Sequence, residues 1–328
     1  MAQQNRRIAL AKRPTGFPEE SDFALEETEI PEPQAGEVLV RARYVSLDPY
    51  QRGRMSEARS YAQPLELGDV ITSQTLGEVV ESRDPRFEPG QLVIGQLGWQ
   101  EYAVARAGTL RRVPEILQPP SLALHVVGGT GMAAYFGLFD VGKPRPGDTV
   151  VVSAAAGAVG QVVGQLAKLA GCRTVGIAGG PDKIEDLRNL FGYDVAIDYK
   201  QDAVRDGVPN GVDVYFDNVG GEVSAAVHSR LAVGARIVVC GQISQYNLER
   251  PEPTFHPGLL IVFRARMEGF LVTDFAHRYE EAAMRLAGWV ADGSIRYRED
   301  VTEGLENAPR AFIGMLRGEN RGKALVKI

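Results

Sequence analysis

The chain has 328 residues, enough for two domains with substantial cores, and its 44% hydrophobic and 24% charged residues are ordinary for a globular protein. A net charge of −6 argues against a general nucleic-acid-binding surface, which would need an excess of lysine and arginine. The first residues lack the apolar segment of a signal peptide. The two cysteines, Cys172 and Cys240, lie in apolar surroundings typical of buried thiols, so we expect a reducing, cytoplasmic location.

The first third of the chain is rich in predicted strands. Segments 37–46, 75–82 and 91–94 are short, contain many β-branched residues and are separated by turn formers such as Glu88-Pro89-Gly90. This pattern predicts a compact, barrel-like β domain.

Beyond Pro119-Pro120, strands and helices are expected to alternate. A helix is predicted over 122–139, and the predicted strands are 149–153, 173–178, 212–217 and 236–240. Such alternation implies a parallel sheet with helices on both faces. Segment 149–167 carries no charge, but its glycines, glutamines and serine favour a strand, turn and helix over a membrane span. A helix over 307–317 and a strand over 323–328 end the chain.

The segment 150–160, VVVSAAAGAVG, predicts a phosphate-binding turn. A buried strand enters a turn of small residues that opens directly into an amphipathic helix. Small side chains let the backbone approach a pyrophosphate, and unpaired amides at the helix start point toward the anion. The pattern is A-x-x-G-x-x-G rather than G-x-G-x-x-G, so tight packing of the helix on the sheet is the alternative explanation.

The end of the second predicted strand of this sheet bears on the choice of dinucleotide. An NAD site normally has an acidic residue there, which binds the ribose 2′-hydroxyl. This chain has Gly179-Gly180 instead, and Lys183 follows where it could pair with a 2′-phosphate. NADPH is therefore favoured, and the alternative is that Lys183 is a solvated lysine in the first turn of a helix.

The sequence predicts no metal site. A zinc alcohol dehydrogenase needs cysteine, histidine or carboxylate ligands, often with a second site of four cysteines, which two cysteines cannot make. Segment 44–50 has no cysteine where a catalytic ligand would lie, and the histidines at 125, 228, 256 and 277 are scattered. Without a Lewis acid, a reaction that needs only hydride donation and a modest proton donor fits better.

Several blocks of sequence, in order and nearly from end to end, carry a family resemblance: 45–50, 98–102, 133–137, 154–160, 215–221, 240–247 and 318–323. On these blocks the chain resembles the zinc-independent medium-chain dehydrogenases/reductases, a group that includes leukotriene B4 12-hydroxydehydrogenase/prostaglandin reductase and the curcumin and alkenal double-bond reductases. The resemblance implies a GroES-like β-barrel-type catalytic domain, formed by 1–122 with 300–328, and a Rossmann NADPH-binding domain, 123–299. It also implies a homodimer.

The resemblance further implies a set of cofactor contacts. Residues Ala156, Gly157, Ala158, Val159 and Gly160 would hold the pyrophosphate, and Lys183 and Tyr199 the 2′-phosphate. The ribose and nicotinamide would be lined by Asn218, Cys240, Gly241, Gln242, Ile243, Ser244, Tyr246, Phe270, Leu271 and Val272. Asn320, near the end of the chain, would close over the cofactor. Asn218 also fits ordinary turn chemistry, which remains an alternative for it.

The implied reaction is NADPH-dependent reduction of the carbon–carbon double bond of an α,β-unsaturated ketone or aldehyde, a small-molecule substrate. The catalytic residues are not identified, but Tyr50, Tyr61 and Tyr246 are substrate-side candidates, since tyrosine offers a ring to a conjugated substrate and a hydroxyl to its oxygen. Each could equally be a packing tyrosine. Phe263 stands where some relatives have a tyrosine. A quinone reductase of the same fold and a catalytically idle NADPH-binding protein are the alternatives.

Overall fold

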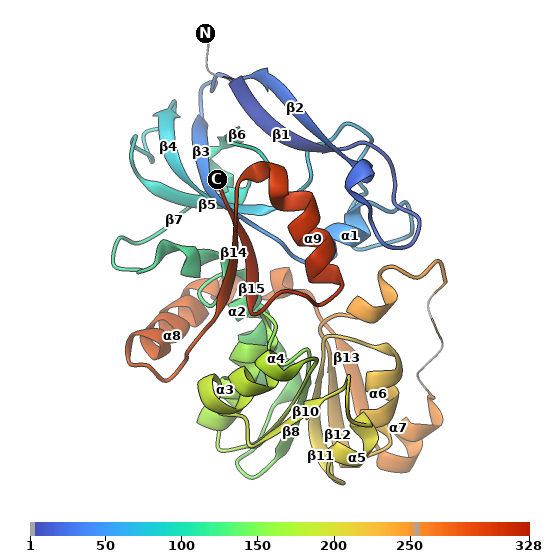
Figure 1. Ribbon diagram of the computed structural model, residues 1–328. Coiled ribbons are helices and arrows are strands. Elements are labelled where there is room, and N and C mark those ends of the chain that lie inside the picture. Colours follow the sequence, from blue (N-terminus) through green and yellow to red (C-terminus); the bar gives the residue numbers. More distant parts are fainter. Residues whose placement is uncertain (1–3, 251, 253–255) are drawn as a thin grey trace. The chain divides into compact units, whose positions relative to one another are not determined.

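The computed structural model describes residues 4–250, 252 and 256–328, which form two units (Figure 1). One unit comprises the described residues of Met1–Leu124 together with Glu299–Ile328, and the other is His125–Arg298. No helix in the described ranges is both long and apolar enough to cross a membrane.

The first unit is built mainly on an antiparallel sheet. Its strands are β3 (Glu37–Ser46), β4 (Gln74–Ser82), β5 (Leu92–Gln96), β6 (Tyr102–Arg106), β7 (Arg111–Arg112), β14 (Glu299–Glu303) and β15 (Lys323–Lys327). The strand order is β14-β15-β3-β4-β5-β7, with β6 pairing with β3. All these pairs are antiparallel except β14 with β15. The C-terminal segment therefore completes the same sheet as the N-terminal strands.

The described part of this unit also contains two further strands and two α-helices. They are β1 (Gln4–Leu10), β2 (Phe23–Glu29), α1 (Tyr50–Arg54) and α9 (Ala308–Leu316). Strand β1 pairs with β2 in a separate antiparallel sheet. The rings of Phe23, Trp99 and Phe312 pack together, so β2 and α9 share one aromatic cluster. Such a cluster buries much apolar area for few residues.

The second unit contains a parallel sheet with the order β10-β9-β8-β11-β12-β13 among the described residues. Its strands are β8 (Thr149–Ser153), β9 (Arg173–Ala178), β10 (Val195–Asp198), β11 (Val212–Asp217), β12 (Leu231–Val239) and β13 (Arg266–Gly269). The order reverses between β8 and β11, as in the doubly wound Rossmann arrangement. The predicted fold class is confirmed.

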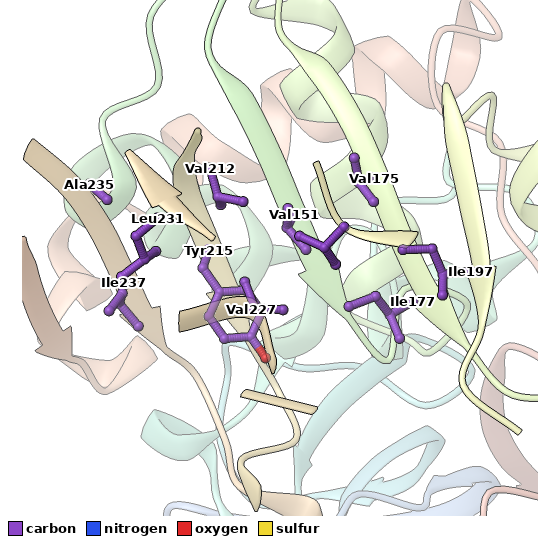
Figure 2. Packing of buried hydrophobic residues seen from close by; sticks show 11 residues of the cluster. Val151, Val175, Ile177, Ile197, Val212, Tyr215, Val227, Leu231, Ala235 and Ile237 are labelled. Atoms are coloured by element: carbon purple, nitrogen blue, oxygen red, sulfur yellow. The ribbon is translucent and has the colours of Figure 1, made fainter. Parts of the chain in front are cut away.

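Helices surround this parallel sheet. They are α2 (Gly129–Phe136), α3 (Gly160–Leu169), α4 (Pro181–Glu185), α5 (Val204–Gly207), α6 (Gly221–His228), α7 (Gly258–Phe263) and α8 (Tyr279–Ala291). Figure 2 shows the core on one face of the sheet, where Val151, Tyr215 and Ile237 project from three neighbouring strands. Val227 of α6 belongs to the same cluster. Burial on both faces explains the near-continuous apolar runs of these strands.

The helix predicted over 122–139 is not continuous. A short 3₁₀ helix covers Pro120–Leu124, α2 begins only at Gly129, and a π-helix follows over Gly137–Gly142. At Gly131, a Cβ atom would lie 1.7 Å from the Val126 carbonyl oxygen, so the chain makes a close backbone approach that only glycine permits. The predicted strand 236–240 is also longer than expected, because β12 begins at Leu231.

Candidate cofactor site

The turn between β8 and α3 has the geometry of an anion-binding site. Ala154 adopts a φ of 48°, and its carbonyl accepts a hydrogen bond from the Gly157 amide at 2.9 Å. A Cβ atom on Gly160 would lie 2.4 Å from that same carbonyl oxygen, so the tight turn requires glycine. No described residue accepts a hydrogen bond from the amides of Ala158 or Val159. Amides left unpaired at a helix start fit a bound pyrophosphate.

The helix that follows this turn is held firmly in place. Gln161 and Gln165 lie one turn apart on α3, and each exchanges two hydrogen bonds with the backbone of the extended segment 296–298. Tyr193 is buried and donates a hydrogen bond to the Gly160 carbonyl at 2.7 Å. The first turn of α3 is therefore fixed without any ligand.

A buried carboxylate organises the point where the strand order reverses. Asp217, at the end of β11, is 3% exposed. It accepts hydrogen bonds from the hydroxyls of Ser153, Tyr215 and Ser224 at 3.1, 2.9 and 2.6 Å. The amides of Val219 and Gly220 donate to it at 2.9 Å each. Burial and the neighbouring carboxylate raise the pKa of Tyr215, so its hydroxyl remains a donor.

Asn218 is positioned by the same network. Its side-chain amide donates to the Ser153 carbonyl at 2.8 Å, and its backbone amide donates to Ser153 Oγ at 2.9 Å. The side chain therefore joins the ends of β8 and β11, more than ordinary turn chemistry requires. Sequence reasoning assigned no role to Asp217, Ser153 or Ser224, although a serine at the end of one parallel strand and Asp-Asn at the end of the next were a usable signal.

The run from Cys240 to Tyr246 lies at the same edge of the sheet. The amides of Cys240 and Gly241 both donate to the Asp217 carbonyl, at 2.8 and 3.1 Å. Ser244 Oγ donates to the Val219 carbonyl at 2.6 Å, and the Tyr246 hydroxyl accepts from the Gln242 amide at 3.2 Å. The structure thus brings the predicted residues after β11 and those after β12 together.

Of the predicted 2′-phosphate residues, Tyr199 lies against the loop that follows β9. Gly180 has a φ of 99°, a conformation that favours glycine over an acidic residue. A Cβ atom on Gly179 would lie 2.6 Å from the Tyr199 ring, so this ring lies directly against the loop. Helix α4 begins directly after these glycines, and Lys183 is its third residue and is half-buried.

The segment Phe270–Val272 follows β13. The Phe270 ring lies against Gly137, where a Cβ atom would come within 2.6 Å of it, and packs edge-on against Phe275 at 6.3 Å between centroids. Leu271 is exposed, and Val272 begins a 3₁₀ helix. Phe263, at the end of α7, packs against the core of the sheet, so its ring contributes to packing.

Asn320, Tyr50 and Tyr61 belong to the other unit. The Asn320 side chain donates to the Gly322 carbonyl at 2.7 Å. The Tyr50 hydroxyl lies 3.5 Å from Gln96 Oε1, and burial together with the Asp48 carboxylate raises the pKa of Tyr50, which keeps its phenol protonated. Tyr61 is 67% exposed in a loop.

A buried ion pair ties two of these segments together. The Lys323 side chain is 1% exposed, and its Nζ donates to Asp48 Oδ1 and to the Leu47 carbonyl, both at 2.8 Å. Gln51 accepts from the Asp48 amide at 2.9 Å and donates to the Ser46 carbonyl at 3.1 Å. The turn that carries Tyr50 is thereby joined to the strand that follows Asn320. Sequence reasoning had not identified this pair.

The two thiols are expected to be protonated and weakly nucleophilic at neutral pH. Burial, reinforced by nearby carboxylates, raises the pKa of Cys172 to about 11 and that of Cys240 to about 12. We expect iodoacetamide at pH 7.5 to label the folded protein far more slowly than the urea-unfolded protein, since the thiolate is the reactive form. Mass spectrometry of labelled peptides checks this, and equal rates in both states would contradict it.

The raised pKa values also make stability depend on pH. Because the thiols of the unfolded chain ionise at about pH 8.5, the contribution of the two protonated thiols to the free energy of unfolding should be lost as the pH rises toward 12.

Within the described parts of the chain, no group of three or more histidine, cysteine or acidic residues is arranged to hold a metal ion. The sequence analysis predicted no metal-binding residues, so there is no predicted ligand set to locate in the structure.

Comparison with known proteins identifies the family. Residues 6–113 match the model described as the N-terminal domain of oxidoreductase, and residues 158–288 match the model described as zinc-binding dehydrogenase. The chain is 43% identical to NADPH-dependent curcumin reductase of Escherichia coli, over 99% of this chain and 97% of that protein. It is 41% identical to 2-alkenal reductase (NADP(+)-dependent) of Nicotiana tabacum, over 99% and 97% of the two chains.

A solved structure supports the same family assignment. The crystal structure of CurA from Vibrio vulnificus in complex with NADPH superposes with a TM-score of 0.92 at 44% identity, covering 98% of each chain. Similarity at this level over the full length is well above that which shows a fold alone, and it agrees with the sequence blocks identified first. The chain therefore belongs to the zinc-independent medium-chain dehydrogenase/reductase family, together with the curcumin and alkenal double-bond reductases.

Proposed function

We propose that the protein is an NADPH-dependent oxidoreductase that reduces the carbon–carbon double bond of α,β-unsaturated ketones and aldehydes. The choice of NADPH rests on the loop Gly179–Gly180, where glycine replaces the acid of an NAD site near Tyr199 and Lys183. Curcumin reductase and 2-alkenal reductase, which share more than two-fifths of their residues with this chain, are named for reactions of this class.

The cofactor contacts are assigned to the domain of residues 123–299, with Asn320 from the domain of residues 1–122 and 300–328. The turn 156–160, with the unpaired amides of Ala158 and Val159, would bind the pyrophosphate, and Lys183 with Tyr199 would bind the 2′-phosphate. Asn218, the residues Cys240–Ser244 with Tyr246, and Phe270–Val272 would line the ribose and nicotinamide. When bound, NADPH supplies the hydride.

The protein's own contribution is to orient the substrate and stabilise negative charge on its carbonyl oxygen. Hydride addition to the β-carbon leaves an enolate, which hydrogen-bond donors near that oxygen stabilise before the α-carbon is protonated. Tyr50 and Tyr246 are the candidate donors with a defined environment, and Tyr50 stays protonated because its pKa is raised. Tyr61, on its exposed loop, is the third candidate. Solvent can deliver the final proton.

A spectrophotometric assay that follows NADPH oxidation tests the proposal. We expect turnover with enones and enals and little turnover with simple quinones, and we expect it to survive EDTA. Faster reduction of quinones would favour a quinone reductase of the same fold. NADPH binding without turnover over a broad panel of enones would favour an idle binding protein. Loss of turnover in EDTA, restored by zinc, would contradict a metal-free reaction.

We also propose that the protein is a homodimer. Strand β13 ends the strand order of the parallel sheet, and none of the described strands pairs with its outer edge. In α7, the helix that precedes β13 in the chain, no residue is buried, and Ile261 and Val262 are 80% and 62% exposed. An open strand edge next to exposed apolar side chains is suited to pairing with a second copy of itself.

Sedimentation velocity should therefore show a dimer that Ile261→Glu converts to a monomer with unchanged circular dichroism. Ile116→Glu is the matched control, because Ile116 is 91% exposed in the other unit and its replacement should leave the dimer intact. A monomeric native protein, or a dimer insensitive to Ile261→Glu, would contradict this interface.

A cytoplasmic location is proposed on the basis of the two free thiols, which are not paired in a disulfide. Cell fractionation followed by immunoblotting tests this location.

A further inference from the structure

The loops after β9 and β10 lie side by side at the predicted 2′-phosphate site. The two strands are parallel neighbours, and Asp198 of β10 is in register with Ala178 of β9. The residues that immediately follow, Tyr199-Lys200 and Gly179-Gly180, are therefore neighbours. The Tyr199 amide confirms this alignment by donating to the Ala178 carbonyl at 3.1 Å.

The Lys200 side chain reaches the same loop as Tyr199. A Cβ atom on Gly179 would lie 3.0 Å from Lys200 Cε and 2.6 Å from the Tyr199 ring. The last methylene of Lys200 therefore rests against Gly179, and the ammonium lies one bond beyond it. No ion pair within the described ranges joins this ammonium to a carboxylate.

Asp198 fixes the spacing of the two loops. Its Oδ1 accepts hydrogen bonds from the amides of Gly180 and Lys200, at 2.9 and 3.0 Å, and the residue is 8% exposed. Asp198 ends β10, whereas the acid of an NAD site ends the strand that corresponds to β9. The two amide hydrogen bonds to its Oδ1 hold the loops together.

We infer that Lys200 is a second cationic residue for the 2′-phosphate, which together with Lys183 determines the preference for NADPH, and that Asp198 positions it. The inference rests on the proposed function and assigns Lys200 a role in binding alone. A lysine ammonium beside a phosphate dianion gives an attraction that salt weakens, and one that a ligand without the 2′-phosphate cannot share.

Isothermal titration calorimetry with 2′,5′-ADP and 5′-AMP isolates this end of the site. We expect Lys200→Met to weaken 2′,5′-ADP about fivefold or more at low ionic strength, to leave 5′-AMP unchanged, and to flatten the salt dependence of 2′,5′-ADP binding. Lys200→Arg should retain most of the affinity. Lys168→Met is the control, since it removes the same charge from a lysine of α3 that is paired with Asp194.

The possible results distinguish the role of Lys200 from the NADPH preference of the native protein. Native protein that prefers 2′,5′-ADP over 5′-AMP, combined with an unaffected Lys200→Met variant, would overturn the role of Lys200 and leave the proposed function standing. Equal losses for both ligands would also overturn it, since they would indicate a distorted loop. Native protein without any preference for 2′,5′-ADP would refute NADPH selectivity itself.

Discussion

Replacement of Lys323 by methionine is expected to lower the free energy of unfolding by about 3–5 kcal/mol, because it removes one partner of a buried ion pair. The lysine side chain is 1% exposed and that of Asp48 14% exposed, so water can replace little of the lost contact. The Leu47 carbonyl loses a donor as well. Urea denaturation followed by circular dichroism measures the change.

Two control variants test whether the loss of stability comes from the buried ion pair. Lys327→Met removes a lysine from the same strand, but its partner Glu303 is 72% exposed, and the effect should be far smaller. The double variant Lys323→Met/Asp48→Asn should recover part of the loss, because the stranded charge is gone. A Lys323→Met protein as stable as the Lys327→Met protein would show that the pair contributes little.

Replacement of Lys183 by alanine is expected to raise the KM for NADPH by roughly ten- to a hundredfold and to leave the KM for NADH nearly unchanged. A charge-assisted hydrogen bond to a phosphate is worth about 1.5–3 kcal/mol, which corresponds to that range. The effect should be selective because NADH has no 2′-phosphate for the lysine to contact. Steady-state kinetics with both dinucleotides measures it.

Lys168→Ala is the matched control for Lys183→Ala, since it lies on α3 and pairs with Asp194. Its NADPH/NADH preference should equal that of the native protein. An unchanged preference in the Lys183→Ala variant would refute the assignment of Lys183 to the 2′-phosphate. Equal increases in both KM values would point instead to damage in the loop Gly179–Gly180.

The parallel sheet was largely predictable from sequence. Strands 149–153, 173–178 and 212–217 have the predicted bounds, because strands buried on both faces are near-continuous apolar runs. Strand β2, with the sequence FALEETE, was missed because one face is exposed and carries glutamates. Its partner is the preceding strand, β1, and the register of that pairing is not visible in local sequence patterns.

The candidate site was predictable where a backbone shape demands particular residues, and less so where distant side chains meet. Glycines 157 and 160 indicated the phosphate turn because only small residues fit there. Lys323, in contrast, has the sequence context of a surface lysine at the start of the last strand. Its burial follows from a contact with Asp48, 275 positions away, which no periodicity encodes.

The low reactivity of Cys240 matters in an enzyme that reduces α,β-unsaturated carbonyl compounds. Such compounds are electrophiles that form covalent adducts with thiolates, and Cys240 stands in the loop assigned to the nicotinamide. Because burial and Asp217 hold its pKa at about 12, almost none of this sulfur is nucleophilic at physiological pH. Alkylation of this thiol by the unsaturated substrates is therefore expected to be slow, and activity should persist over many turnovers.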